Sequence, residues 1–488
     1  MAALLAAACG DDDGGNGGSP DSGPRADAGG DPDGGGDPAE VYAFESRFQA
    51  GASSVVYSGQ ALRQVLIGDL NAYISALSTT APEDFPEDVL GDLLFYYEFD
   101  AEVGGEAAIR LTTEPAPLQS TYGAIGNANL KSKLAGNDAM GQHKDWTDPG
   151  TFVGWPGGDG TTPEELVLHY FAEIDAHADA FAAGNAPDDP RGNQITLAHV
   201  SAGGLDYRQL ANKFLLVAVA YSQATDDYFD NDLAEHGINV DNEVAALSGE
   251  EEQPYTQLEH HWDEGFGYFG PARDYLAYTD EEMEGVGGRP EFQKYHDSDD
   301  DGAIDLTAEY IYPWAGYAAR RDNGSAEAAP SDFTGEIFGA LLAGRRIIST
   351  AGGALSEAQM DELVAERDKA VAAWEKLVAA NVVHYLNEVL KDMNRFEAED
   401  YDFLGHAGHW AEAKAFALGL QFNPRKALSD EQFAELHQLL GVAPVLETAT
   451  NPQIDNYKAD LVAARAIIAE AYDFDAANIG DDNGENGW

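Results

Sequence analysis

The chain has 488 residues, of which 44% are hydrophobic and 10% aromatic, so it can bury a sizeable core. Its 87 acidic residues against 27 basic ones give a formal net charge of −60 at pH 7. This balance argues against binding to nucleic acid or anionic lipid head groups, because each phosphate contact requires a lysine or an arginine. A saline environment, cation binding or simple solvation of the surface each accounts for such an acidic chain.

The first nine residues, MAALLAAAC, form a short run of small apolar residues that ends in the only cysteine, Cys9. The run resembles the end of a bacterial lipoprotein signal, although it has no basic n-region and Ala6 stands where leucine is commoner. It is too short to span a bilayer. We therefore expect lipid attachment at Cys9 and a place in the bacterial cell envelope. Gly10 carries no inner-membrane retention signal, which favours the outer membrane.

Glycine, aspartate and proline dominate residues 10–40, and almost nothing there is suited to a core. Such a segment is a flexible, self-repelling tether. We expect it to hold a helical domain, residues 41–474, away from the anchoring membrane. Residues 475–488 are expected to form a frayed acidic tail.

The pattern between tether and tail is mainly helical. Residues 205–229 read as an apolar helix with a polar end, and apolar residues recur every three or four positions across 356–393. Residues 53–59 are the best strand candidate. The chain is predicted to be an all-α protein, a large helical bundle with long loops. Three capping boxes mark helix starts: Thr162 to Glu165 with Pro163, Ser356 to Gln359, and Ser429 to Gln432.

The insert 291–312 contains an acidic loop, HDSDDDGAIDL. Its aspartates occupy positions 1, 3, 5 and 9 of an EF-hand-type loop, and a glycine at position 6 permits the tight turn. Ala308 stands at position 12, where a glutamate is expected, and Glu309 follows it. We predict calcium binding in a structural role, and the alternative is an ordinary acidic turn. The predicted ligands are Asp297, Asp299, Asp301 and Asp305.

The stretch 258–270, LEHHWDEGFGYFG, has a relative near the C-terminus. The segment HWDE that begins at His261 aligns with the segment HWAE that begins at His409. On a helix, a histidine and a glutamate three or four positions apart share one face, so both His260 and His261 share a face with Glu264. The recurrence predicts two related halves of the fold.

Two interpretations of these motifs stay open. If the halves pack face to face, the histidines and glutamates meet in the bundle core, as in the transition-metal sites of helical bundles. Imidazole and carboxylate suit iron, zinc, manganese or copper. Alternatively, each histidine bonds a facing carboxylate in a buried polar seam that needs no metal. The candidate metal ligands are His261, Glu264, His409, Glu412 and His260, with His406, His384 and the ladder His169, Glu173 and His177 as further candidates.

Standard catalytic signatures are absent from the sequence. It contains no HExxH motif or its inverted form, no GxSxG motif and no glycine-rich phosphate loop. A single cysteine also excludes an internal disulfide and a cysteine-rich metal cluster. Whether the chain is an enzyme is therefore left open.

Several blocks, among them VVYSGQALRQVLIGDLNAYI, GGLDYRQLANKFLLVAVAYSQATDDYF, LEHHWDEGFGYFG and KYHDSDDDGAIDL, occur in the order found in a bacterial lipoprotein family of unknown function. The resemblance covers most of residues 50–445. That family is similar to the imelysins, helical proteins often linked to iron acquisition, whose Gly-x-His-x-x-Glu motif looks like a metal-binding motif. Both His-x-x-Glu segments of this chain match its second part, but Glu259 and Ala407 replace the glycine.

Three functions follow as hypotheses. The first is a lipid-anchored cell-envelope protein that binds a metal ion or a metal complex, with iron as a candidate, for uptake or storage. The second is a metallohydrolase that uses a His-x-x-Glu metal site, with Asp263 or Glu259 as the base. The third is a surface interaction module in which the His–Glu pairs are only structural. In all three, the protein contacts a membrane only through its lipid anchor, and the protein partner is unknown.

Overall fold

The computed structural model describes residues 40–138, 141–155, 161–233 and 236–488. Cys9 and nearly all of the predicted tether lie outside these residues. α-Helices dominate the described part, and its single sheet pairs two strands of two residues each. The prediction of an all-α helical bundle is therefore confirmed. Among the described residues, no helix is both long and apolar enough to cross a membrane.

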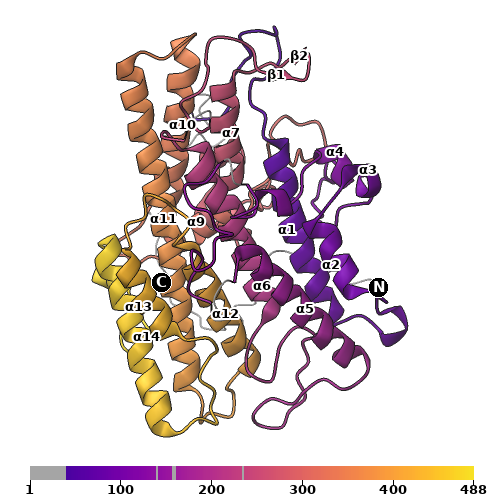
Figure 1. The fold of residues 1–488 in the computed structure, drawn as a ribbon, viewed down its shortest axis with the longest axis vertical. Helices are drawn as coiled ribbons and strands as arrows, with labels where there is room; N and C mark the ends of the chain where they lie inside the picture. The colour runs from indigo at the N-terminus through magenta and orange to yellow at the C-terminus, as the bar shows by residue number, and fades with distance from the viewer. Residues whose placement is uncertain (1–39, 139–140, 156–160, 234–235) are drawn as a thin grey trace.

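The helices and strands follow one another along the chain as shown in Figure 1. The α-helices are α1 (Ser58–Leu77), α2 (Val89–Tyr97), α3 (Ala101–Gly104), α4 (Tyr122–Ile125), α5 (Pro163–Ala182), α6 (Tyr207–Leu215), α7 (Gln257–Phe269), α8 (Asp280–Glu284), α9 (Pro313–Asn323), α10 (Phe333–Ala351), α11 (Glu357–Asn394), α12 (Phe403–Gly419), α13 (Asp430–Leu440) and α14 (Asn451–Tyr472). Two π-helical segments, η3 (Leu216–Tyr221) and η4 (Gln223–Tyr228), extend α6, and short 3-10 turns lie at η1 (Pro82–Asp84), η2 (Lys131–Lys133), η5 (Tyr275–Ala277) and η6 (Ala476–Asn478). The strands are β1 (Leu247–Ser248) and β2 (Glu251–Glu252).

The capping boxes predicted from the sequence all open helices. Thr162 caps α5, Ser356 caps α11 and Ser429 caps α13, each by accepting a hydrogen bond from the backbone N–H three residues later. These contacts satisfy N–H groups that have no partner inside the helix. Local sequence therefore determines where these helices begin.

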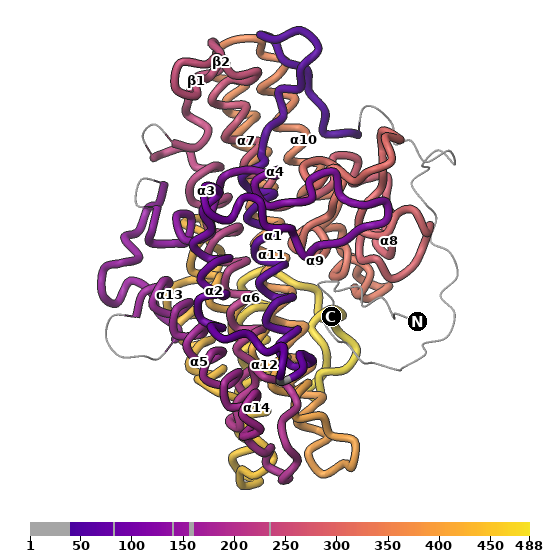
Figure 2. The backbone as a smooth tube through the Cα atoms, turned by 90° about the vertical axis from the view of Figure 1, so that its right-hand side faces the viewer, coloured from indigo at the N-terminus to yellow at the C-terminus, as the bar shows by residue number. Residues whose placement is uncertain are grey.

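Helix α11, with 38 residues, is the longest helix and runs along one side of the bundle (Figure 1). α10 and α12 pack along it most extensively, α14 also contacts it, and α13 packs on α14. On the other side, α6 joins α12 to α1 and α5. Figure 2 shows the segment around α8 projecting from the same bundle.

An aromatic core lies where α7, α9, α11 and α12 meet. Trp374 of α11 contacts the ring of Phe269 at the end of α7, with centroids 5.2 Å apart, and the ring of Trp314 on α9 at 5.9 Å. Phe416, near the end of α12, lies 5.6 Å from Trp314. The C-terminal ends of α7 and α12 therefore reach the same core, α7 from above and α12 from below in Figure 1.

Residues 475–488, expected to fray, instead pack against the bundle. The Trp488 side chain is only 4% exposed, and its indole N–H donates to the carbonyl of Arg321 at 2.9 Å. Asn387 on α11 donates to the carbonyl of Trp488 at 2.9 Å, and Arg465 on α14 donates to the carbonyl of Asp481 at 2.7 Å. An aromatic side chain with buried polar partners outweighs the acidic composition of this segment.

The strand expected at residues 53–59 is not formed. Ser53 makes an isolated bridge with Glu45, and α1 already begins at Ser58. Ser54 and Val55 are both buried although they join no sheet, and the Ser54 hydroxyl accepts a hydrogen bond from Arg345 of α10.

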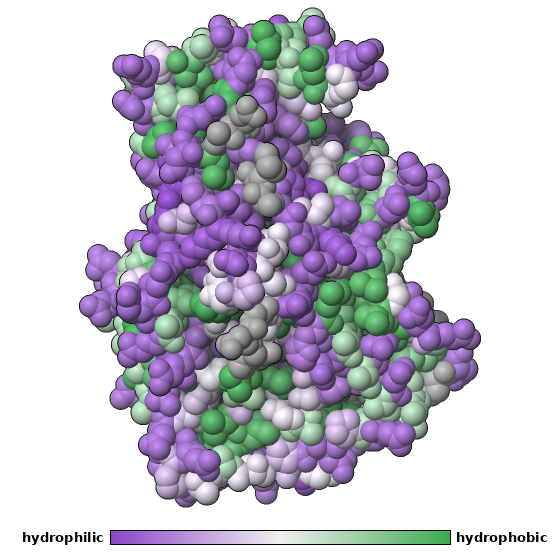
Figure 3. All heavy atoms as spheres, in the orientation of Figure 1, coloured by the Kyte–Doolittle hydropathy of each residue, from purple (hydrophilic) through white to green (hydrophobic). Residues whose placement is uncertain are grey.

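Hydrophilic side chains cover most of the face shown in Figure 3, as expected for a chain of this net charge. Large exposed hydrophobic side chains such as Val103, Leu247 and Val286 come from separate segments of the chain. Such single exposed residues are normal on a folded protein and do not mark a docking surface.

Candidate metal centres

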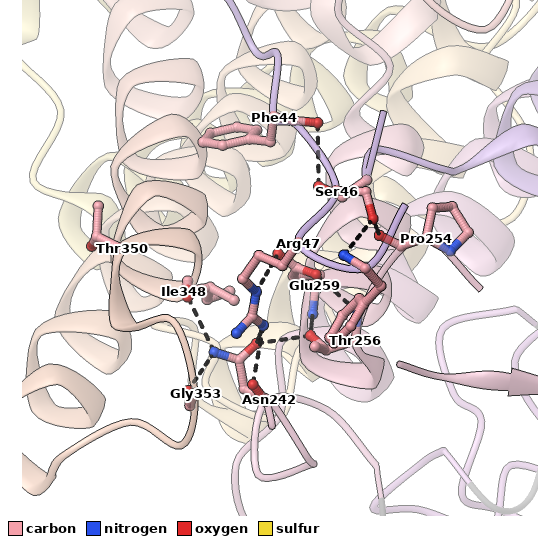
Figure 4. Close-up of polar contacts among 12 residues, drawn as sticks. Phe44, Ser46, Arg47, Asn242, Pro254, Thr256, Glu259, Ile348, Thr350 and Gly353 are labelled. Carbon is pink, nitrogen blue, oxygen red and sulfur yellow. Dashed lines mark hydrogen bonds and ion pairs between the residues drawn. The ribbon is translucent and has the colours of Figure 1, made fainter. Parts of the chain in front are cut away.

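Helix α7 begins in a polar network that joins distant segments (Figure 4). The Thr256 hydroxyl accepts from the backbone of Glu259, and the Glu259 carboxylate accepts from the backbone of Thr256. Asn242 accepts from the Thr256 hydroxyl at 2.8 Å and donates to the carbonyls of Ile348 (3.1 Å) and Gly353 (2.8 Å). The start of α7 is thereby fixed to the end of α10.

A buried arginine of α10 neutralises two carboxylates of the α7 motif. Arg345 is fully buried and donates to Asp263 at 2.8 Å, to Glu259 at 3.1 Å and to the Ser54 hydroxyl at 2.8 Å. The Tyr42 hydroxyl also donates to Asp263, at 2.7 Å. Burial raises the pKa of the Asp263 carboxyl, although Arg345 opposes that shift. The two carboxylates considered as hydrolytic bases are therefore bonded to Arg345 in the core.

The histidines of α7 bond backbone carbonyls. Nδ1 of His260 lies 3.1 Å from the carbonyl of Val56, and Nδ1 of His261 lies 2.7 Å from the carbonyl of Gly237. Glu264 accepts a hydrogen bond from Gln60 at 2.9 Å and lies 3.8 Å from His260. Burial lowers the pKa of His261, which keeps this histidine neutral.

The α12 motif has different partners. Nδ1 of His409 lies 2.8 Å from the Asp392 carboxylate of α11, and Glu412, 2% exposed, lies 3.1 Å from the ammonium of Lys213 on α6. Burial disfavours the charged imidazole, but the hydrogen bond and the charge of Asp392 outweigh it and raise the pKa of His409 to about 9. His409 is therefore a cation at neutral pH.

The structure does not bring the two motifs together. In the described part of the chain, two groups place three or more possible metal ligands within 4.8 Å of one another, and neither contains a histidine or glutamate of these motifs. Because α7 and α12 approach the aromatic core by their C-terminal ends, His261 and His409 each lie about 10–12 Å of helix away from it. Each motif is satisfied by its own neighbours.

The first of the two groups lies in the acidic loop and includes Glu309. Carboxylate oxygens of Asp297, Asp299 and Glu309 lie within 4.8 Å of one another, about twice the length of a Ca–O bond. Glu309, 4% exposed, is held by the backbone N–H and hydroxyl of Ser298, both at 2.6 Å, and by the N–H of Asp305 at 2.8 Å. The glutamate one position beyond the EF-hand pattern thus points into the loop.

Two of the predicted calcium ligands are not in this group. Asp301 accepts from the backbone of Ala303 at 2.8 Å, and Asp305 accepts from Gln119 at 2.8 Å and from the Thr307 hydroxyl at 2.7 Å. These bonds direct the two carboxylates to other groups. An antiparallel bridge between Tyr295 and Tyr310 closes the stem of the loop, where an EF-hand would have a helix.

The second group is not predicted by any motif in the sequence. Nε2 of His143 lies 2.9 Å from Oδ1 of Asp232 and 3.6 Å from Oδ1 of Asp230. Nδ1 of the same ring lies 2.5 Å from Oδ1 of Asp226 on the π-helical segment η4. Arg425 donates to the same Asp230 oxygen at 2.6 Å. One imidazole therefore has two carboxylates at one nitrogen and a third at the other.

The contact between Asp226 and His143 resembles the one found beside many metal-binding histidines. A histidine that ligates a metal usually donates its other N–H to a carboxylate, which fixes the tautomer and the ring orientation. Asp226 and Asp230 are buried, while the side chains of His143 and Asp232 are 28% and 76% exposed, so the group can be reached from solvent. Burial raises the pKa of Asp226 to about 6, and this residue also raises the pKa of His143 against the effect of burial.

Part of this group could have been noticed in the sequence. The strongly apolar helix ends in residues 223–232, QATDDYFDND, which contain four aspartates. Carboxylates that are buried require partners. A π-helical segment at that point is a further sign, since such segments are frequent at functional sites. His143 lies some eighty residues earlier in an irregular segment, and no spacing links it to the aspartates.

Comparison with known proteins finds a match for one part of the chain. No curated protein and no solved structure matches the chain. Residues 161–288 match the family model of a domain of unknown function (DUF4856). This range contains the α7 motif and the aspartates of η4 but neither His143 nor the acidic loop.

Proposed function

We propose that this chain is a metal-binding protein that holds a transition-metal ion at His143, Asp230 and Asp232. The observation that carries the proposal is the chain of contacts from Asp226 through His143 to the other two aspartates. Nitrogen with carboxylate oxygen suits iron, manganese or zinc, and hard-cation sites rarely use imidazole. An ion at this point would share one Asp230 oxygen with Arg425.

Metal analysis of the intact protein tests this function. Protein purified without chelator is expected to contain iron, manganese or zinc, or to take up one equivalent of one of them after dialysis. His143→Gln should abolish that uptake. His169→Gln changes an exposed histidine of α5 and should leave it unchanged. A wild-type protein that stays metal-free with all three ions contradicts the proposal.

The role of Asp226 gives a second readout of the same site. Asp226→Asn removes the charge behind His143 but leaves every proposed ligand in place. Loss of such a partner typically weakens metal binding by about 10–100-fold. An unchanged affinity in Asp226→Asn would mean that the contact is only structural.

We also propose calcium as a structural cofactor of the acidic loop, bound by Asp297, Asp299 and Glu309 and completed by water or backbone oxygens. An ion there would neutralise carboxylates that now lie close together. Calcium at about 100 times its Kd should stabilise the fold by about 2.7 kcal/mol. Glu309→Gln should remove that gain, whereas Glu291→Gln, an exposed glutamate in the same insert, should keep it. A calcium-independent melting temperature in the wild type would contradict this cofactor.

For the setting of these sites, we propose a lipid-anchored protein of the bacterial cell envelope. The proposal is supported by the lipoprotein-like run that ends at Cys9 and by the resemblance to imelysin-like lipoproteins. Metal ions for uptake or storage would be the cargo in that setting. The full chain expressed in a Gram-negative host should be recovered in the outer-membrane fraction, and Cys9→Ser should release it. Equal recovery of both forms in the soluble fraction would contradict the anchor.

A further inference from the structure

The Asp230 carboxylate has one oxygen that is fixed by the backbone and one that faces the proposed metal centre. Oδ2 accepts from the backbone N–H groups of Asp232 at 2.7 Å and of Leu233 at 2.6 Å. Oδ1 lies 3.6 Å from Nε2 of His143. A metal ion beside His143 would therefore bind Asp230 through Oδ1.

Arg425 already bonds that oxygen. Its Nη2 atom donates to Oδ1 of Asp230 at 2.6 Å, and its Nη1 atom donates to the carbonyl of Thr225 at 2.9 Å. Asp230 is fully buried, and a buried carboxylate requires such a partner. A divalent ion bound to the same oxygen would lie next to the guanidinium, and two cations that close in a buried site repel each other strongly. The ion and Arg425 therefore compete for Asp230.

Arg425 also lines a cavity into which its side chain can move. The cavity has a volume of about 450 Å³ and lies between α11, the segment that follows α12 and the end of α14. Its wall includes Asp368 and Asp473, both exposed, so a displaced guanidinium would meet carboxylates there. Backbone hydrogen bonds hold Asp230 in place, whereas the Arg425 side chain is 24% exposed. The arginine is therefore the member of the pair that can leave.

A second arginine keeps the end of η4 capped when Arg425 moves. Arg367 on α11 donates to the carbonyl of Phe229 and to Oδ1 of Asn231. Arg425 lies 3.5 Å from the same Phe229 carbonyl. Burial lowers the pKa of Arg367, and the charge of Arg425 lowers it further, because the two guanidinium groups repel each other. Departure of Arg425 would relieve this repulsion and leave the Phe229 carbonyl bonded.

We propose that Arg425 is an exchangeable counter-ion of the metal centre. It neutralises Asp230 in the metal-free protein, and a bound ion takes its place at Oδ1 while the guanidinium moves into the cavity towards Asp368 and Asp473. The inference rests on the proposed function and names a residue that sets the affinity of that site. Arg425 acts by competing with the metal, so its removal strengthens metal binding, whereas structural damage to the site would weaken it.

Calorimetric titration of the full chain with Fe²⁺ under nitrogen, Mn²⁺ and Zn²⁺ tests this competition. Arg425→Gln should bind the preferred ion at least about tenfold more tightly than the wild type, because the competing charge is gone. Arg425→Lys keeps a cation at this position and should bind the ion less tightly than Arg425→Gln. Lys426→Gln removes the next charge along the chain, which pairs with Asp430, and should leave the affinity unchanged.

The result separates this inference from the metal centre itself. The metal centre stands and the exchange is overturned if the wild type binds the ion, His143→Gln does not, and Arg425→Gln binds it equally or more weakly. If the wild type and every Arg425 variant stay metal-free, the metal centre is contradicted and the exchange falls with it.

Asp473→Asn tests the destination of the guanidinium and remains informative if Arg425→Gln does not fold. Asparagine tolerates the positive φ of 52° at this position. Loss of an acidic partner for the displaced Arg425 should weaken metal binding by about two- to fivefold. Asp455→Asn removes an equal charge from an exposed position near the start of α14 and should have a smaller effect. Equal metal affinities of the two variants would contradict the movement into the cavity.

Discussion

Helices α7 and α12 each carry a histidine, a tryptophan and a glutamate at the same spacing, but the two motifs meet different surroundings. His261 bonds the carbonyl of Gly237 and burial lowers its pKa, whereas His409 bonds the Asp392 carboxylate and its pKa rises to about 9. Glu264 meets an amide, and Glu412 meets a lysine. The equal spacing determines which side chains share a helix face, whereas the contacts with neighbouring segments determine whether each histidine is charged.

The largest expected effect concerns Arg345, the α10 arginine that bonds two carboxylates of the α7 motif. Arg345→Leu leaves Asp263 and Glu259 buried without their main cation, so we expect a loss of about 3–5 kcal/mol in the free energy of unfolding. Denaturant unfolding measures this loss. Arg346→Gln, next to it but exposed, should change stability by less than about 0.5 kcal/mol. Equal stability of the two variants would show that the network contributes little.

The next effect concerns the cationic histidine of α12. Asp392→Asn removes the charge that opposes burial, so the pKa of His409 should fall from about 9 to below its ordinary value. The raised pKa of His409 corresponds to a contribution of about 3 kcal/mol to the free energy of unfolding at pH values below 6.5. NMR titration of the His409 ring measures the pKa. A value that stays near 9 in the variant would assign the shift to another group.

The two histidines should also give opposite pH dependences. His409 has a raised pKa, so its contribution to stability is complete below pH 6.5 and is lost as the pH rises towards about 9. His261 has a lowered pKa, so its contribution is complete above pH 6.5 and is lost as the pH falls below that value. His409→Gln should flatten the alkaline side of the stability profile and His261→Gln the acidic side. Identical profiles for the two variants would contradict the assigned charges.

The smallest expected effect is on metal content. The double substitution of His261 and His409 by alanine should lower stability but leave the number of bound transition-metal ions unchanged, because neither residue belongs to a group of possible ligands. Elemental analysis of the variant beside the wild type measures this. Loss of the metal in the variant would return the site to the two motifs.

Much of the fold was predictable because it depends on local chemistry. The boxes at Thr162, Ser356 and Ser429 begin helices as predicted, since a hydroxyl and the N–H three residues later need nothing else. The docking of Trp488 was missed because composition describes the average of a segment, and one buried indole determines where it lies.

In the candidate sites, too, local spacing was predictable and contacts between distant segments were not. Asp297 and Asp299 lie close together within one loop, and Glu309, which lies outside the EF-hand spacing, joins them through its contacts with Ser298 and Asp305. His143 could not be linked to Asp230 and Asp232 from the sequence, because their proximity arises only when an irregular segment packs against the end of η4.

The most direct test of the central claim is the transition-metal stoichiometry of the intact protein, wild type against His143→Gln, measured by elemental analysis after equilibration with iron, manganese and zinc in turn. The proposed site predicts about one equivalent of one of these ions in the wild type and none above background in His143→Gln, with both proteins folded by circular dichroism. Equal metal content in the two proteins would contradict the assignment of the metal centre to His143, Asp230 and Asp232.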